Sequence, residues 1–192
     1  AIASFERTLI SFNAPFDRFI AGEKDAISAS AQRGWKLFQG KARCITCHEF
    51  NRSYPFFTNN KFHNVGVVMK GKDFAFLARK AASSGADPSA LVQEEASAEL
   101  GRYLVTKEPK DIGAFKTSGL RNIALTAPFM HDGSESTLES VVEFYNKGGV
   151  PNPNFDSGIR PLNLSEDEKK DLVEFMKSLT SDDLAGLGIT IK

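Results

Sequence analysis

The chain has 192 residues, and its 24 Lys and Arg are balanced by 24 Asp and Glu, so the formal net charge at neutral pH is zero. This length suits one domain with a sizeable core, and the balanced charge gives no indication of nucleic acid or an anionic membrane as a general partner. No apolar run approaches the roughly 18 residues that span a bilayer, so no membrane span is predicted. The start AIASFERTL carries charges where a signal peptide would be apolar, so an exported protein would be present here in its mature form.

The first half of the chain shows helical periodicity separated by an irregular stretch. Apolar residues at helical spacing from Ile2 to Phe12 predict a helix that stops near Pro15. A second amphipathic stretch, from Ile27 to Phe38, ends at Gly40. Residues 50–70 are rich in Asn, Phe and Gly without a clear period, which indicates a loop.

The second half alternates helices with long loops in the same way. Asp87 and Pro88 predict the start of a helix that continues through Val105, followed by loop over 107–135. Capping boxes at Ser136 and Ser165 predict two further helices, running to Gly148 and to about Leu179. No strand pattern exceeds a few residues, so the chain is predicted to be mainly α. Loops this long are uncommon unless they wrap a ligand or partner.

The stretch CITCH, residues 44–48, contains both cysteines of the chain and a histidine. It is the C-x-x-C-H signature of covalent haem attachment, in which Cys44 and Cys47 add to the haem vinyl groups and His48 binds the iron. Structural zinc would need four ligands, and no second cysteine pair exists. A thioredoxin-like dithiol usually follows a strand in a βαβ pattern, which is missing here. A disulfide between Cys44 and Cys47 would close a loop of only two residues and would stabilise the fold little. The motif therefore favours haem c.

The chain also contains 16 Phe residues. They could line the site of this flat cofactor or form an ordinary aromatic core.

The iron's sixth ligand is left open by the residues alone. The candidates are Met69, Met130, Met176, His63, His131 and Tyr145. Methionine is the common choice in electron-transfer haems, and Met130 lies in a loop where it could reach the iron. Met176 lies on the apolar stripe of the last predicted helix, where a core position is the simpler interpretation. Spacing does not choose among them.

Four motifs in order resemble one known family. They are CITCH, residues 56–67 (FFTNNKFHNVGV), residues 113–149 (GAFKTSGLRNIALTAPFMHDGSESTLESVVEFYNKGG) and residues 159–179 (IRPLNLSEDEKKDLVEFMKSL). Together they resemble the C-terminal haem domain of the bacterial di-haem cytochrome c peroxidase and MauG family, with residues about 70–100 as an insertion. The resemblance implies a c-type cytochrome domain over residues 1–192, whose helices and long loops wrap one covalently bound haem.

The resemblance also implies a sixth ligand. The family places it fourteen residues after the histidine of the HDG motif, and from His131 that count reaches Tyr145. The peroxidase branch has methionine there, whereas the MauG branch, which this sequence resembles in EFYNKGG, has tyrosine. A phenolate favours ferric and higher iron states, so this ligand implies a low reduction potential.

Three further assignments come from the same resemblance. Backbone carbonyls of Thr126 and Pro128 match ligands of a calcium ion that lies between the two haem domains. His63, in the family's FHN motif, and His131, near the haem edge, are expected to hold the haem loops in place rather than to bind iron.

The chain departs from the family because it has one C-x-x-C-H and lacks the half that reacts with peroxide. With both axial positions filled, it is expected to be a poor catalyst alone. We therefore expect the electron-transferring half of a peroxidase-like or MauG-like oxidoreductase, with the other haem in a second domain or chain. The alternatives are a stand-alone mono-haem carrier and a haem-containing structural subunit. The redox partner is expected to be a small cytochrome, a copper protein or a protein side chain, and haem c attachment predicts the periplasm.

Overall fold

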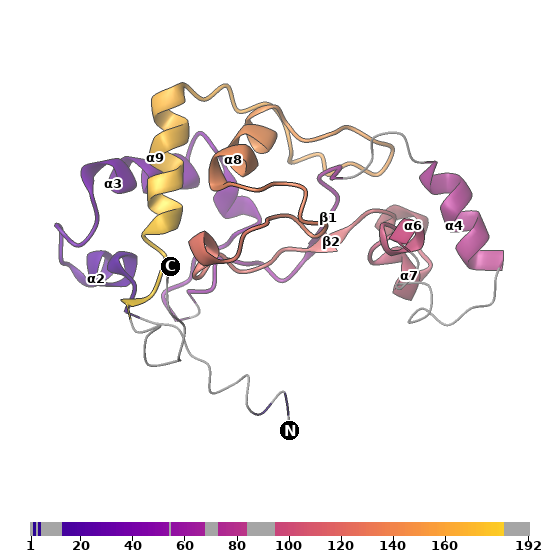
Figure 1. Ribbon diagram of the computed structural model, residues 1–192, viewed down its shortest axis with the longest axis horizontal. Helices are drawn as coiled ribbons and strands as arrows, with labels where there is room; N and C mark the ends of the chain where they lie inside the picture. Colours follow the sequence, from indigo (N-terminus) through magenta and orange to yellow (C-terminus); the bar gives the residue numbers. More distant parts are fainter. Residues whose placement is uncertain are drawn as a thin grey trace.

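A computed structural model describes residues 2, 4, 13–53, 55–67, 73–83 and 95–182 (Figure 1). The helices are α2 (Pro15–Ala21), α3 (Ala29–Gln39), α4 (Phe74–Ser83), α6 (Glu95–Ala98), α7 (Tyr103–Thr106), α8 (Leu138–Asn146) and α9 (Glu166–Lys177), with 3-10 turns η1 (Cys44–Thr46), η2 (Pro109–Asp111) and η3 (Ile123–Leu125). The strands are β1 (Phe62–His63) and β2 (Phe115–Lys116). The prediction of a helix-rich chain with few strands is confirmed.

The helices α3 and α9 cross in contact, and α8 packs beside α9 (Figure 1). Gly34 allows this close crossing, because a Cβ at that position would lie 1.9 Å from the backbone oxygen of Asp171. An ion pair also joins the two helices: Arg33 donates two hydrogen bonds of 2.7 Å to the buried carboxylate of Asp171, and Ser30 donates a third. The pKa of Asp171 is lowered, chiefly by the bond from Arg33.

Replacing Gly34 with alanine is expected to destabilise the protein by about 1–3 kcal/mol, because an overpacked contact against backbone cannot relax as a side chain would. Urea unfolding followed by circular dichroism would measure the change. Lys36→Ala, on the exposed face of the same helix, is the control and should stay within about 0.5 kcal/mol of wild type. Equal stabilities for the Gly34→Ala and Lys36→Ala variants would contradict this packing.

An aromatic cluster fills the space between these helices and the residue 50–57 loop. Its ring centroids lie 5.0–6.3 Å apart. The members are Phe16, Phe19, Trp35, Phe38, Phe50, Phe57 and Phe175. Much of the phenylalanine content therefore builds a core.

The second end of the molecule carries α4, α6 and α7, and the two-stranded sheet lies between this end and the α3–α9 pair (Figure 1). The strands β1 and β2 are antiparallel, with His63 opposite Phe115. Tyr103 on α7 donates a 3.2 Å hydrogen bond to the carbonyl of Ala78 on α4. No described helix is long and apolar enough to cross a membrane.

Several predicted boundaries were wrong. Pro15 begins α2, a helix that the periodicity missed. The helix predicted from Ile2 to Phe12 lies almost entirely outside the described residues. The single helix expected through Val105 is interrupted at Gly101, whose φ is +57°, so α6 and α7 are separate. Its predicted start at Asp87 lies outside the described residues.

The predicted start of α8 was one residue too early, whereas that of α9 was correct. The cap of α8 is Thr137 with Ser140, one residue later than predicted, and α8 ends at Asn146 before Gly148. The expected cap of α9, Ser165 with Glu168, is confirmed. The helix α4 was not predicted.

Candidate haem site

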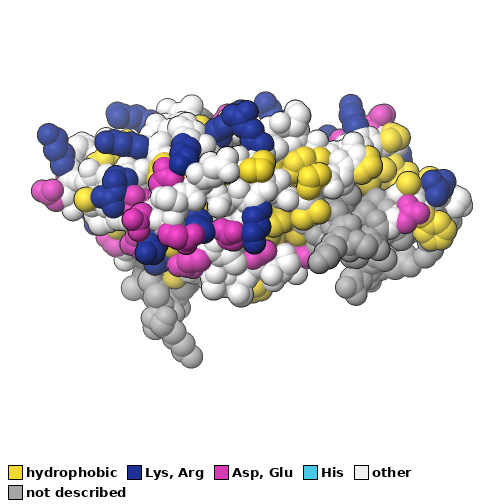
Figure 2. Space-filling model, turned by 90° about the horizontal axis from the view of Figure 1, so that it is seen from above, with side chains coloured by type: hydrophobic (Ala, Val, Ile, Leu, Met, Phe, Trp, Pro, Cys, Tyr) yellow, Lys and Arg dark blue, Asp and Glu magenta, His cyan; other side chains and the backbone are white. Residues whose placement is uncertain are grey.

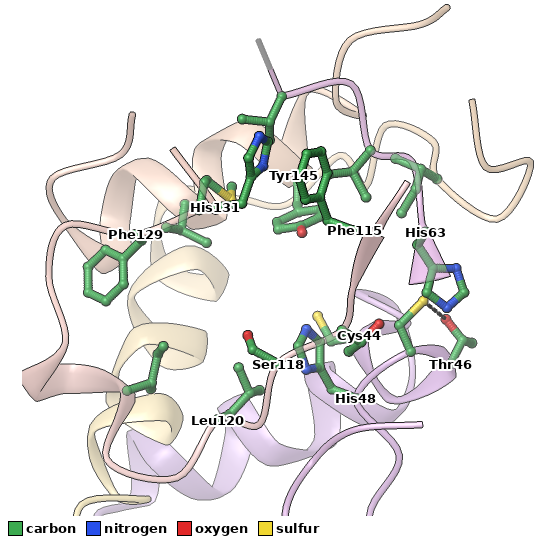
Figure 3. Close-up of a pocket in the computed structure, with 18 of the residues that line it drawn as sticks. Cys44, Thr46, His48, His63, Phe115, Ser118, Leu120, Phe129, His131 and Tyr145 are labelled. Carbon is green, nitrogen blue, oxygen red and sulfur yellow. Dashed lines mark hydrogen bonds between the residues drawn. The ribbon is translucent and has the colours of Figure 1, made fainter. Parts of the chain in front are cut away.

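A cavity of about 420 Å³ lies between the CITCH segment and α8 (Figure 3). Its volume falls in the usual range for sites that bind small molecules or cofactors. Aliphatic residues from four segments form much of its lining: Val65, Val67, Leu120, Ile123, Leu138, Val141, Ile159 and Leu162. The site therefore fits a largely apolar ligand.

His48 projects into this cavity from the CITCH segment (Figure 3). Its backbone N–H donates to the carbonyl of Cys44 at 2.9 Å, which closes the turn of the motif. Its ring Nδ1 donates to the carbonyl of Phe57 at 2.9 Å, which leaves Nε2 as the nitrogen available to a metal. Burial lowers the pKa of His48 despite the opposing effect of nearby backbone carbonyls. The imidazole is thus oriented and neutral, as a metal ligand must be.

The aromatic core fixes this orientation through Phe57. The ring of Phe57 is fully buried in the cluster, while its backbone is left-handed at φ +57°, so that its carbonyl receives His48. Arg121 stabilises the same loop, because it donates to the carbonyl of Pro55 and, through two 2.7 Å bonds, to the carboxylate of Asp17 on α2. The helix α2, absent from the sequence prediction, thereby helps to position the site.

Cys44 and Cys47 lie on and next to the η1 turn, and both line the cavity with His48. Cys44 Sγ lies 3.6 Å from the carbonyl of Ala42, and Thr46 donates to Cys47 Sγ at 3.9 Å. Burial raises the pKa of Cys44 to about 12, and burial also raises that of Cys47. Both cysteines are free thiols that face the same space as the imidazole.

Tyr145 reaches the cavity from α8, on the side opposite His48 (Figure 3). Its hydroxyl has no hydrogen-bond partner within the described chain. Burial, followed by the nearby Cys44 and Cys47, raises its pKa. Met130 and Met176 also line the cavity, and Met176 is buried in the core as well. Met69 lies outside the described residues.

The two other histidines also border the cavity, and each is held by an acidic partner. His63 Nδ1 donates to Asp156, and its Nε2 accepts from Asn59 at 3.1 Å. Burial opposes ionisation of Asp156, but the bonds from His63 and Gly158 outweigh it, so its pKa is lowered. With both ring nitrogens engaged, His63 fastens β1 to the 150–160 loop.

His131 makes a different set of contacts. Its Nε2 donates to Glu99 at 2.9 Å, and its ring stacks on Phe115 with centroids 3.5 Å apart. Glu99 is only 8% exposed and follows α6. The sequence did not predict Glu99 or Asp156 as partners of these histidines, because no motif contains either residue.

Thr126 and Pro128 lie at the exposed edge of the cavity, just after η3. The Ala127–Pro128 peptide bond is cis. Within the described ranges, no group of three or more His, Cys, Asp or Glu side chains is placed to hold a metal ion. A calcium site here would therefore depend on backbone oxygens and on ligands from elsewhere.

The residues present fit a haem c group. Two thiols and a neutral imidazole lie on one wall, a tyrosine with no hydrogen-bond partner among the described residues lies on the other, and the space between them is largely apolar. These are the groups needed to bind a porphyrin covalently and its iron axially.

Comparisons with known proteins agree with the motif analysis. The chain is 39% identical over 186 residues to cytochrome-c peroxidase IdrP1 of Denitromonas iodatirespirans, covering 94% of this chain and 48% of that protein. It is 38% identical over 185 residues to the methylamine utilization protein MauG of Methylorubrum extorquens, covering 96% and 44%. The chain thus spans about half the length of these curated relatives. No protein-family model matches it.

Solved structures give the same result. A MauG-like protein associated with microbial copper homeostasis is 30% identical, with a TM-score of 0.70 over 95% of this chain and 56% of that one. The diheme peroxidase BthA from Burkholderia thailandensis is 20% identical, with a TM-score of 0.62 over 91% and 48%, and shows likeness of fold alone. The resemblance recognised in the motifs is confirmed over nearly the whole chain.

Proposed function

Because the chain is a homologue of cytochrome c peroxidases and MauG proteins, we propose that it is the haem c-bearing, electron-transferring part of such an oxidoreductase. The observation that carries the proposal is the placement of His48 opposite Tyr145, with both thiols on the His48 wall. Cys44 and Cys47 would form the thioether bonds. His48 and Tyr145 would bind the iron from opposite sides. Bound there, the haem supplies one-electron redox chemistry.

The protein residues then hold the site in one geometry and limit access to it. The carbonyl of Phe57 keeps the His48 ring in one tautomer, and the aliphatic lining excludes water around it. With His48 and Tyr145 both bound to the iron, the domain would offer no open position for peroxide. Its role is therefore to pass electrons to and from its surroundings.

We place the peroxide-reacting haem in a second domain or chain, and treat this chain as the C-terminal half of the di-haem architecture. The homology over about half of each relative supports a missing portion. Backbone carbonyls of Thr126 and Pro128, both on the exposed edge, would contribute to a calcium ion at that junction. The exposed Leu125 next to them suits a contact with another protein surface.

The other redox partner is proposed to be a protein: a small cytochrome, a copper protein or a protein side chain. On the face seen in Figure 2, Lys and Arg side chains are interspersed with Asp and Glu. This mixed surface suits a transient protein partner better than a polyanion. Because haem c is attached outside the cytoplasm, we propose a periplasmic location.

Native mass spectrometry of the protein from its natural source tests the proposal of a companion. We expect a particle with two haems per copy of this sequence, in one longer chain or in two chains. A stable one-haem monomer that does not react with peroxide would contradict the proposal and support a mono-haem carrier. A one-haem chain without reversible reduction in a larger complex would support a structural subunit.

A further inference from the structure

The imidazole of His48 is held by two chain segments, residues 55–58 and 117–121. Its Nδ1 donates to the carbonyl of Phe57 at 2.9 Å. Ser118, in the second segment, lies beside the ring (Figure 3). Burial lowers the pKa of His48, and the carbonyls of Phe57 and Ser118 both oppose this change. The placement of the two segments therefore decides how His48 faces the cavity.

Hydrogen bonds join these two segments along their length. Thr58 donates to the carbonyl of Thr117 at 2.7 Å, and the backbone N–H of Leu120 donates to the carbonyl of Phe56 at 3.2 Å. Gly119 permits this approach, because a Cβ there would lie 2.8 Å from the carbonyl oxygen of Phe56. The segments therefore form one unit, and a contact that fixes one of them also fixes the other.

Arg121 fixes the end of this unit. Its Nε donates to the carbonyl of Pro55 at 2.7 Å, and its two terminal nitrogens each donate to the carboxylate of Asp17 at 2.7 Å. The guanidinium carbon also lies 5.8 Å from the centre of the Phe57 ring. Because the side chain of Arg121 is only 11% exposed, water and salt screen its ion pair less than they would a surface pair.

The backbone of Phe57 needs such support, because it is left-handed with a φ of +57°. This conformation is unfavourable for a bulky residue and persists where the surrounding contacts determine it. A rotation of this backbone would turn the Phe57 carbonyl away from Nδ1 of His48. Loss of the contacts that Arg121 makes is therefore expected to weaken the hydrogen bond of His48.

We propose that Arg121, anchored by Asp17, is a positioning residue for His48 and keeps the reduction potential of the haem low. The inference rests on the proposed function, because it requires His48 to bind iron. A hydrogen bond from Nδ1 to a carbonyl increases the basicity of an imidazole ligand, and a more basic ligand favours ferric over ferrous iron. Arg121 and Asp17 lie outside the cavity lining and act through the Phe57 carbonyl.

The test compares two arginine–aspartate pairs in the haem-loaded protein. Arg121→Lys keeps the positive charge, but an ammonium cannot reproduce the planar set of three bonds. Arg33→Lys is the matched control, because Arg33 makes two similar bonds to Asp171 and joins α3 to α9 outside the cavity lining. We expect Arg121→Lys to raise the midpoint potential, equivalent to an about two- to fivefold larger equilibrium constant for reduction by a fixed donor. Arg33→Lys should leave the potential close to that of wild type.

Exchange of the Nδ1 proton of His48 provides a readout that a merely structural role would not move. Its rate can be measured by nuclear magnetic resonance on protein that contains isotope-labelled histidine. A weaker hydrogen bond protects the proton less, so exchange should be about three- to tenfold faster in Arg121→Lys than in wild type. Arg33→Lys should exchange this proton at the wild-type rate.

Asp17→Asn is a second variant for the case that Arg121→Lys does not fold, and Asp171→Asn is its control. Asp17→Asn should change the exchange rate in the same direction by a smaller factor. Unchanged exchange in the variants of Arg121 and Asp17, or equal changes in the two control variants, would overturn the inference. A protein without haem would instead refute the proposed function, and its intact mass would reveal this before any variant is made.

Discussion

Replacing Tyr145 with phenylalanine is expected to convert the ferric haem protein from a six-coordinate to a five-coordinate, high-spin state. The phenylalanine keeps the ring that fills the α8 side of the cavity and removes the oxygen that faces His48. Since burial raises the pKa of Tyr145, its phenolate form requires a neighbouring cation, which the iron would supply. Absorption and electron paramagnetic resonance spectra of the ferric protein would show the change.

The same variant should bind cyanide more tightly than wild type by roughly one to two orders of magnitude, because apparent affinity scales with the fraction of sites that are open. Met130→Leu is the matched control, since Met130 also lines the cavity, and its spectrum should stay close to that of wild type. A sulfur-to-iron absorption band in the wild-type ferric protein, lost in Met130→Leu, would assign the ligand to Met130 instead.

Removing both cysteines, by Cys44→Ala with Cys47→Ala, is expected to abolish covalent haem attachment. Each single variant retains one thiol and should keep part of its haem through one thioether bond. In the double variant, nearly all remaining haem should be extractable by acidified organic solvent, as measured by absorbance of the two phases. Thr46→Ala changes one of the two residues between the cysteines and should retain the haem. Covalent haem in the double variant would refute the assigned attachment site.

The elements that the sequence predicted well are those with complete local signals. The helix α3 has a regular apolar face and ends before Gly40, and α9 has a full capping box at Ser165. The helix α2 was missed because Pro15 was interpreted as a stop, although proline is also favoured in the first helical turn. The break before α7 depends on Gly101, where a Cβ would lie 2.4 Å from the carbonyl oxygen of Ala114, a contact that is not visible in local sequence.

In the candidate site, too, local patterns predicted some residues and missed others. The motif and the family spacing predicted the residues that face the cavity, because both concern positions close in sequence. The residues that hold them could not be predicted: Asp156 reaches His63 across 93 positions, and Glu99 reaches His131 across 32. The role of Phe57 depends on a backbone carbonyl, which any residue possesses. Such contacts follow from tertiary packing and leave no pattern in one sequence.

The proposal that this chain carries one covalently bound haem through Cys44 and Cys47 can be checked by the intact mass of the purified protein. The mass should be measured before and after extraction with acidified organic solvent. We expect a mass equal to the polypeptide plus one haem in both measurements. A mass equal to the polypeptide alone, or a haem that the solvent removes, would contradict it.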